Sequence, residues 1–332
     1  MSTIRDIARL AGVSVSTASL ALNGDQRVRQ VTRARVEAAA NSLDYHPTRA
    51  ARSLSKGRTW SVQLLFPGDT AMSTGFFSRF LRGLHDGARD RGCSVGVSVP
   101  VDAAEARETL NRLMRGRWAD GVVLMNLKAD DVLVRDALEF GFPHVLLGRS
   151  CFADVPTVDN DNCAVARAAT LHLVHRGCRD VVLLNGPADQ AFTRERADGF
   201  REAHQLANCA APDDGVLFTD GQPETARAVI ARLLRAGRRL DGIVAVSDSL
   251  AVAAMQAVRE HGLDIPREVR LIGMNNDDVS QFVTPRLSTV ELHSFELGRT
   301  AVGMLLDRID GVSGGGERRI VAFDLIERDS SA

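Results

Sequence analysis

The chain has 332 residues, of which 45% are hydrophobic and 25% charged, and its formal net charge is −1. That length is enough to bury large cores in more than one domain. No apolar run approaches the roughly 20 residues of a membrane-spanning helix, and the N-terminus does not resemble a signal peptide. Five scattered cysteines without a CxxC pair argue against a disulfide framework and indicate reduced thiols. We therefore expect a cytoplasmic protein.

The charge is distributed unevenly along the chain. Residues 1–58 hold ten Arg or Lys and four acidic side chains, which gives this head a net charge of +6. Since the whole chain carries −1, the remaining residues carry −7. A cationic head on an anionic body is typical of a protein that binds nucleic-acid phosphates with one end.

Residues 3–24 predict a helix, a tight turn and a second helix. Thr3 can cap the first helix with Asp6 answering it, Gly12 suits the left-handed residue that ends a helix, and Ser14 can cap the second helix. A third periodic segment, about residues 30–43, would close a small core. In this helix-turn-helix pattern the second helix lies in the major groove of DNA. Its outward positions are Val15, Ser16, Ser19 and Leu20, and its inward positions are Ala18, Ala21 and Leu22.

From about residue 60 short apolar runs alternate with amphipathic segments. The runs are residues 62–66, 94–99, 121–125, 144–147, 181–184, 242–246 and 269–272, and the predicted helices include 77–91, 105–115, 163–176, 197–205, 223–236 and 249–261. Strands spaced by helices of this length predict parallel sheets with helices on both faces. Ligands in such folds bind beyond the carboxyl ends of the strands.

Ordered motifs along the chain carry a family resemblance. They are Asp6-Ile7-Ala8, Ala11-Gly12-Val13-Ser14, Tyr45-His46-Pro47, Ala50-Ala51-Arg52-Ser53-Leu54, Val158-Asp159-Asn160, Gly186-Pro187, Arg194-Glu195-Arg196, Gly199-Phe200, Ser247-Asp248, Ile265-Pro266, the segment Thr284 to Val290, and the closing Glu327-Arg328-Asp329-Ser330-Ser331-Ala332. The chain resembles the lactose-repressor and purine-repressor (LacI) family of bacterial transcription regulators over essentially its full length.

The resemblance implies an all-α helix-turn-helix head and a hinge helix, joined to an α/β two-lobed effector domain like a type I periplasmic binding protein. The expected domains are residues 1–46 for the head, 47–59 for the hinge, and 60–332 for effector binding and dimerisation. Within the last, residues 60–159 and 290–319 form one subdomain and residues 160–289 and 320–332 the other. The family binds a pseudo-palindromic operator as a dimer, so we expect a homodimeric repressor that is found with the nucleoid when bound.

The resemblance also implies a set of DNA contacts. The hinge, from Pro47 to about Ser55, is too short to form a stable helix alone, so DNA and a partner hinge must drive its folding. Leu54 matches the residue that wedges into the minor groove. Leu20 stands where many members carry Arg or another polar residue; it cannot bond guanine but can touch a thymine methyl. The expected DNA-binding residues are Thr3, Ser14, Val15, Ser16, Thr17, Ser19, Leu20, Asn23, Arg33, Ala51 and Leu54.

An effector site is implied between the two lobes. A fixed guanidinium fork such as Arg194 suits hydroxyl, carboxylate or phosphate oxygens, although an interlobe salt bridge is the alternative role. A sugar or sugar derivative is the expected effector. The sequence leaves open whether this effector releases the protein from DNA or promotes its binding. The expected effector-binding residues are Phe76, Phe77, Asp159, Arg194, Ser247 and Asn275.

Other kinds of chemistry find little support in the residue pattern. His172, His175 and Cys178 have a spacing that suits a metal but lack a nearby fourth ligand, and the glycines 314–316 do not form a dinucleotide-binding loop. No nucleophile elbow is present, so we expect neither an enzyme nor a cofactor. Two alternatives stay open: a periplasmic-type sugar-binding protein, and an architectural DNA binder without an effector.

Overall fold

The computed structural model describes residues 2–22, 24–45, 57–66, 74–125, 131–312 and 314–332. The chain folds into two compact units, residues 1–59 and residues 60–332, here called the head and the body. Residues 46–56, which hold most of the predicted hinge helix, lie outside the described residues. No helix in the described ranges is both long and apolar enough to cross a bilayer.

The head consists of three helices, α1 (Ile4–Leu10), α2 (Val15–Leu22) and α3 (Gln30–Ser42), around a small apolar core. The Asp6 carboxylate accepts hydrogen bonds from the backbone N–H and the hydroxyl of Thr3, at 3.0 and 2.8 Å. Gly12 has a φ of +60°, and the Thr17 backbone N–H donates to Ser14 Oγ over 3.1 Å. The predicted caps and the left-handed glycine are therefore confirmed, and they set the turn between α1 and α2.

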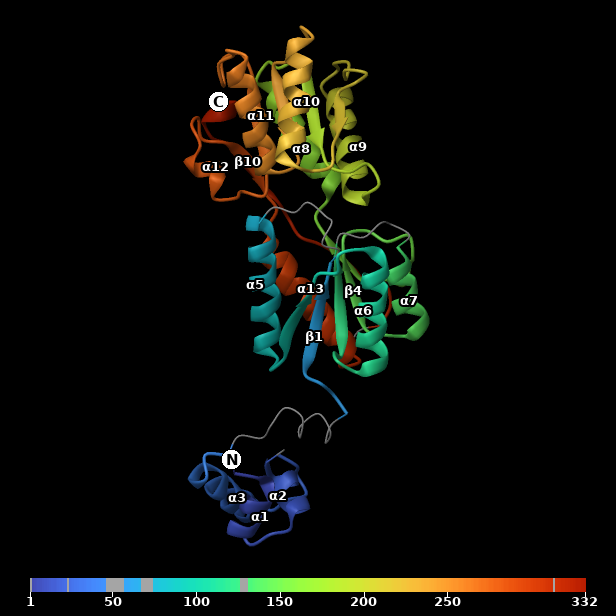
Figure 1. The fold of residues 1–332 in the computed structure, drawn as a ribbon, viewed down its shortest axis with the longest axis vertical. Coiled ribbons are helices and arrows are strands. Elements are labelled where there is room, and N and C mark those ends of the chain that lie inside the picture. The colour runs from blue at the N-terminus through green and yellow to red at the C-terminus, as the bar shows by residue number, and fades with distance from the viewer. Residues whose placement is uncertain (1, 23, 46–56, 67–73, 126–130, 313) are drawn as a thin grey trace. The chain divides into compact units, whose positions relative to one another are not determined.

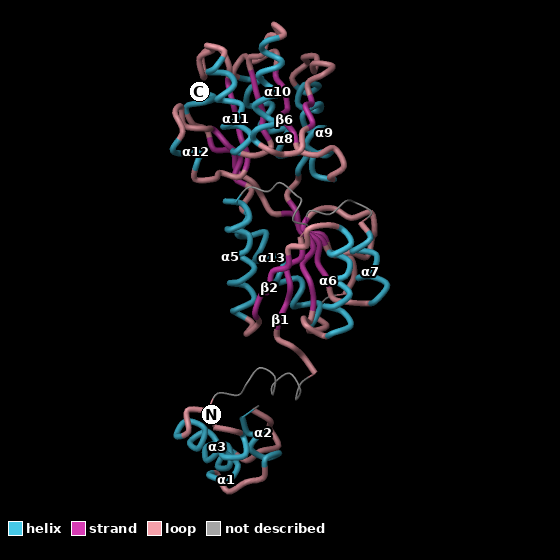
Figure 2. Tube along the Cα trace, in the orientation of Figure 1, coloured by secondary structure: helices cyan, strands magenta, loops and turns pink. Residues whose placement is uncertain are grey.

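The first sheet of the body is parallel throughout, in the order β11-β5-β4-β3-β1-β2. Figures 1 and 2 show its strands between α5 and α13 on one side and α6 and α7 on the other. Its elements are β1 (Ser61–Leu65), α5 (Thr74–Asp90), β2 (Ser94–Ser98), α6 (Ala103–Gly116), β3 (Gly121–Met125), α7 (Val132–Phe140), β4 (His144–Leu147), β5 (Thr157–Asp159), α13 (Ser294–Ile309) and β11 (Arg318–Ile320).

The second sheet has the order β12-β10-β9-β8-β6-β7, and only β12 runs antiparallel, against β10. Its elements are α8 (Asn162–His175), β6 (Val181–Asn185), α9 (Ala191–Leu206), β7 (Val216–Phe218), α10 (Pro223–Arg235), β8 (Gly242–Ala245), α11 (Asp248–Glu260), β9 (Arg270–Met274), α12 (Val279–Phe282), β10 (Ser288–Glu291), β12 (Asp324–Ile326) and a closing 3₁₀ turn (Asp329–Ser331). The chain passes between the two sheets after β5, after β10 and after β11.

Both sheets are covered on both faces, and their central strands are buried along their length, as in β3 and β6. In the first sheet, alternate residues of one strand enter different cores: Val123 packs with α5 and α13, while Val122 and Leu124 pack with α6 and α7. The alternating pattern of strands and helices therefore predicted the sheet class correctly.

One predicted helix begins earlier than expected. The predicted segment 197–205 is part of α9, which starts at Ala191. Its first two turns bury the polar residues Thr193 and Arg196, so hydrophobic periodicity does not mark them. The six extra residues matter, because they place the Arg194-Glu195-Arg196 motif on a helix.

Helices α5 and α13 approach each other closely at two glycines. A Cβ built on Gly83 would lie 2.0 Å from the Phe295 carbonyl oxygen, and one on Gly298 would lie 2.1 Å from the Phe80 carbonyl oxygen. Since both obstacles are backbone atoms, a side chain can be fitted only if the helices separate. These glycines set the spacing of α5, whose first turn lines the pocket described below.

We expect Gly83→Ala to lower the free energy of unfolding by about 1–3 kcal/mol, because the added methyl overpacks the helix contact. The matched control is Gly303→Ala, in the same helix α13 as Gly298, where no atom lies within 4 Å of a built Cβ. There alanine should be neutral or stabilise by up to about 1 kcal/mol. Chemical denaturation of both variants measures this, and equal losses would contradict the proposed contact.

Candidate functional site

The predicted DNA-reading residues gather at the N-terminal end of α2. Val15 is 44% exposed, and Ser16 is also exposed, while Ala18 and Ala21 are buried in the head core. Leu20 is half-buried and packs partly against that core, so its side chain is less free than the sequence suggested. The exposed surface of α2 therefore contains short aliphatic and hydroxyl side chains.

The other predicted DNA contacts surround this surface or fall outside the described residues. Thr3 and Ser14 are caps at the surface of the head, Thr17 is bonded to Ser14, and Ser19 is partly buried. Arg33 donates from Nη2 to the Asp25 carbonyl oxygen over 2.8 Å, which fixes its guanidinium beside the turn that precedes α3. Asn23, Ala51 and Leu54 lie outside the described residues.

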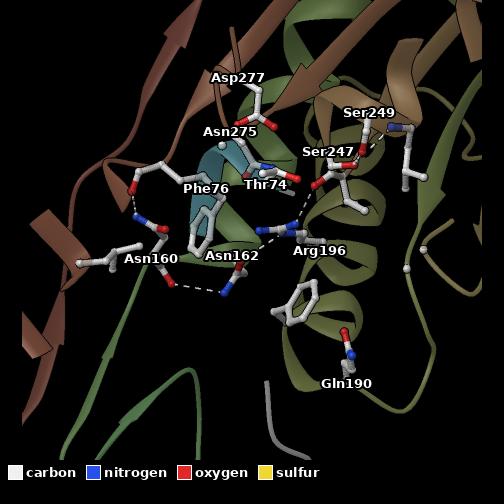
Figure 3. Close-up of a pocket in the computed structure, with 18 of the residues that line it drawn as sticks. Thr74, Phe76, Asn160, Asn162, Gln190, Arg196, Ser247, Ser249, Asn275 and Asp277 are labelled. Carbon is white, nitrogen blue, oxygen red and sulfur yellow. Dashed lines mark hydrogen bonds between the residues drawn. The ribbon is translucent and has the colours of Figure 1, made fainter. Parts of the chain in front are cut away.

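The body contains a cavity of about 820 Å³ lined by residues from both of its sheets. It lies where α5 begins and beyond the carboxyl ends of strands β4, β5, β6, β8 and β9, the place that open α/β sheets offer to ligands. Figure 3 shows Phe76, Asn162 and Arg196 pointing into one space from three different segments. The polar lining side chains are Thr74, Ser78, Asp159, Asn160, Asn162, Gln190, Arg196, Gln222, Ser247, Ser249, Asn275, Asp277 and Asp278.

A chain of hydrogen bonds links an acid and a base at the floor of this pocket. The Asn162 side-chain amide donates to both carboxylate oxygens of Asp159, at 3.1 and 3.2 Å. Arg196 donates from Nε to Asn162 Oδ1 over 3.0 Å and from Nη1 to the Val246 carbonyl over 3.2 Å. The centre of the Phe192 ring lies 4.9 Å from the Arg196 guanidinium carbon. Arg196 is therefore held rigidly while it faces the cavity.

Burial dominates the electrostatics of this chain of side chains. It raises the pKa of Asp159 to about 7, and the nearby Glu195 carboxylate adds to that rise. Burial also lowers the pKa of Arg196 to about 10, although Asp159 opposes the shift. Asp248, which accepts the Thr289 hydroxyl over 2.6 Å, has its pKa raised to about 7 by burial as well.

Four of the six predicted effector residues line the pocket: Phe76, Asp159, Ser247 and Asn275. Ser247 is also the N-cap of α11, where its Oγ accepts the Leu250 backbone N–H over 3.3 Å. Asn275 follows β9 with a φ of +103°, a conformation that places its side chain in the lining while its N–H bonds to the Val290 carbonyl. These residues come from four separate segments and meet only in the folded body.

The other two predicted residues are placed elsewhere. Phe77 points into the core of the first sheet, where its ring centre lies 4.8 Å from that of Phe66. Arg194 is exposed, and its Nε donates to the Ala188 carbonyl oxygen. The guanidinium in the pocket belongs to Arg196, because residues two apart on a helix face different directions. The motif Arg194-Glu195-Arg196 therefore contributes one arginine to the pocket lining, and the helical phase of α9 makes it Arg196.

Two sets of contacts join the first-sheet side of the pocket to the second-sheet side. Arg149, which follows β4, forms a 2.5 Å ion pair with Glu195 of α9. Arg79 of α5 donates to the carbonyl oxygens of Asn275 and Asn276 and lies 3.2 Å from an Asp277 carboxylate oxygen. Both contacts would have to change if the angle between the two sheets changed.

Two of the three side chains considered for a metal, His172 and Cys178, have separate partners. His172 Nε2 lies 2.7 Å from the Ser331 hydroxyl, and the Cys178 thiol donates to the Asp241 carbonyl oxygen. Within the described residues no group of three or more His, Cys, Asp or Glu side chains is arranged to hold an ion.

Comparison with protein families and known proteins agrees with this architecture. Residues 3–48 match the family described as bacterial regulatory proteins, lacI family, and residues 170–331 match a periplasmic binding protein-like domain. The HTH-type transcriptional regulator CelR of Thermobifida fusca is 30% identical over 333 residues, which cover 99% of this chain and 98% of that protein. The ribose operon repressor of Escherichia coli (strain K12) is 29% identical over 337 residues, which cover both chains fully.

Solved structures show the same fold. A complex of the transcriptional regulator CelR with cellobiose has a TM-score of 0.77 at 28% identity and covers 99% of this chain and all of that one. A lac repressor dimer bound to operator and the anti-inducer ONPF has a TM-score of 0.87 at 23% identity and covers 99% of each chain. Head, body and similarity over the full length agree: the chain belongs to the lacI family of bacterial regulatory proteins and is a helix-turn-helix transcription regulator that binds DNA.

Proposed function

We propose that this protein is a repressor that binds a pseudo-palindromic operator as a homodimer and is switched by a small sugar bound in the body pocket. The observation that carries the proposal is the pocket itself: about 820 Å³, lined from both sheets, with the rigid Arg196 on its floor. A relative of similar fold is solved with cellobiose, which supports a sugar as the ligand class. The protein would act as a regulator and not as an enzyme, in the cytoplasm and at the nucleoid.

The charge of the pocket favours an uncharged sugar over a sugar phosphate. Among the lining residues that the structure describes, Arg196 is the one basic side chain, and the acidic side chains are Asp159, Asp277 and Asp278. Two of the Arg196 nitrogens already donate inside the protein. Amide and hydroxyl side chains can both donate to and accept from sugar hydroxyls, and Phe76 and Phe192 offer apolar surface to a sugar ring.

We propose that the ligand acts by changing the angle between the two sheets of the body. The Arg149–Glu195 ion pair and the contacts of Arg79 are formed at one angle between the two sheets. A ligand that binds more tightly to a conformation with another angle shifts the population toward that conformation and breaks these contacts. The predicted hinge, with Ala51 and Leu54 at the minor groove, would then form or melt. Repression is the proposed output, and the sign of the ligand effect is left to measurement.

A ligand panel tests this function. The full chain is mixed separately with neutral mono- and disaccharides, sugar phosphates, sugar acids and nucleosides, and thermal unfolding and DNA binding are followed for each. A neutral sugar should raise the melting temperature by mass action and change the affinity for DNA. If no compound does either while DNA is bound specifically, the architectural alternative is correct. If a sugar raises the melting temperature but leaves the affinity for DNA unchanged, the proposed switch is wrong although sugar binding stands.

A further inference from the structure

The recognition helix of this protein lacks the side chains that usually read bases by hydrogen bonding. Guanine is read by Arg or Lys, adenine by Asn or Gln, and cytosine by Asp or Glu, because these side chains match the base edges in the major groove. Helix α2 has the sequence Val-Ser-Thr-Ala-Ser-Leu-Ala-Leu, which contains none of them. Its contacts to bases must therefore come from hydroxyl and methyl groups.

The exposed part of α2 is rich in methyl groups. Val15, in the first turn, is 44% exposed, and Leu20 is half-buried, with one part of its side chain against the head core and the rest accessible. Ser16 lies beside Val15 and offers a hydroxyl, which can donate or accept and so discriminates weakly between bases. In a helix-turn-helix the N-terminal residues of the second helix meet the base edges, so Val15 is well placed to do so.

The hydroxyls at the start of α2 are partly used inside the head. Ser14 Oγ accepts the Thr17 backbone N–H over 3.1 Å and shares a 2.8 Å hydrogen bond with the Thr17 hydroxyl. These bonds cap the helix and bind the two hydroxyls to each other. They leave the methyl groups of Val15 and Leu20 as the most distinctive chemistry on this surface.

The positive charge of the head is carried by other segments. Arg9 lies on α1 and pairs with Asp6 at 2.7 Å, Arg27 lies in the turn before α3 and pairs with Asp25 at 2.8 Å, and Arg33 lies on α3. Arginines on segments other than the reading helix suit phosphates, which add affinity without sequence information. Affinity and base discrimination are thus divided between different residues.

We infer that this head distinguishes its half-site in the major groove mainly through the C5-methyl groups of thymine, contacted by Val15 and Leu20. The inference rests on the DNA-binding function described above. A thymine methyl buried against these side chains leaves water, which accounts for a preference over every base that lacks the group. Because 5-methylcytosine carries a methyl at the same place in the groove, it should be accepted where thymine is preferred.

The test uses modified operators. The full chain first selects a consensus duplex from a random pool, and each thymine of one half-site is then replaced singly by deoxyuridine, which lacks only the methyl. At one or more positions, deoxyuridine should lower the affinity of the protein for the duplex about fourfold. This is the factor expected when one buried apolar carbon group is returned to water. Replacing guanines by 7-deazaguanine, which removes the N7 acceptor, should leave the affinity of the sites facing α2 unchanged.

Two variants assign the effect to residues. Val15→Ala, at an exposed position that does not support the core, should remove the deoxyuridine penalty at one position and keep the others. Leu20→Arg should replace a thymine preference by a guanine preference in a new selection, because a guanidinium can bond O6 and N7 together. Arg9→Ala is the control: it should weaken all sequences alike and reduce the salt dependence.

The results distinguish a failure of this inference from a failure of sequence-specific DNA binding. If the consensus binds equally well with every thymine replaced, or if 7-deazaguanine reduces binding at the sites facing α2, the methyl readout is wrong although DNA binding stands. If the pool yields no enriched duplex at all, sequence-specific DNA binding itself fails and the inference fails with it.

Discussion

Replacing Arg196 by methionine is expected to remove at least about half of the thermal stabilisation that a bound sugar gives. Methionine keeps an apolar stem in the buried site but has no donor for the ligand, and a lost hydrogen bond to a charged group costs about 1.5–3 kcal/mol. Affinity should therefore fall by about 10- to 150-fold. A ligand held at 100 times the original Kd stabilises the native protein by about 2.7 kcal/mol, and the variant should retain about 0.3–1.4 kcal/mol of this.

The matched control is Arg194→Met, two residues away in the same helix. Arg194 is exposed and donates to the Ala188 carbonyl oxygen, so its loss should leave the ligand shift intact. The unliganded Arg196 variant will also melt earlier, because Asn162 and the Val246 carbonyl lose their donor. The informative quantity is therefore the shift between liganded and unliganded protein. Loss of that shift in the Arg194 variant and its retention in the Arg196 variant would reverse the assignment.

Asp159→Asn is expected to reduce the loss of stability that accompanies a rise in pH from acid to neutral. Burial raises the pKa of Asp159 to about 7, well above its unfolded value near 4. Between these values the native state holds a proton that the unfolded chain has released, so stability falls as the pH rises from about 4 to 7. Asparagine keeps the shape without the charge. Relative to the wild type, the free energy of unfolding of the variant should rise by about 2–3 kcal/mol between pH 5 and pH 8, since the slope acts over about two pH units.

Urea unfolding of the unliganded proteins at pH 5, 6, 7 and 8 measures this difference. At pH 5, where Asp159 is mostly protonated, the difference in the free energy of unfolding between variant and wild type reports the cost of replacing the carboxyl group by an amide. The growth of that difference toward pH 8 reports the ionisation of Asp159 in the wild type. Asp248, whose pKa burial also raises to about 7, contributes a slope of the same sign and is unchanged in this variant. The variant should therefore keep part of the pH dependence. A constant difference at every pH would show that Asp159 is ionised throughout.

The head illustrates what local sequence predicts well. Thr3 with Asp6, Gly12 and Ser14 are all confirmed in their roles at the helix ends, because capping and the left-handed conformation depend on residues within three or four positions. The alternation of strands and helices in the body is equally local, and it predicted parallel sheets. The half-buried position of Leu20 needed the three-helix packing, which the pattern of α2 alone does not contain.

The pocket shows where such reasoning stops. Phe76 and Phe77 are adjacent in the sequence, yet the first lines the cavity and the second packs against Phe66. Asn162, which joins Asp159 to Arg196, carried no signal of its own, because an asparagine at the start of a helix is usually a capping residue. Its role requires contacts with two segments that are distant along the chain.

The sequence by itself determined the family, the basic head with its capped helices, and the order of elements in the body, since these follow from motifs, charge and short-range periodicity. Only the tertiary structure decided which arginine of the Arg194-Glu195-Arg196 motif faces the pocket. The reason is physical: α9 buries polar residues in its first turns, so its start and its phase are fixed by packing against α8 and the second sheet and not by a pattern that can be read along the chain.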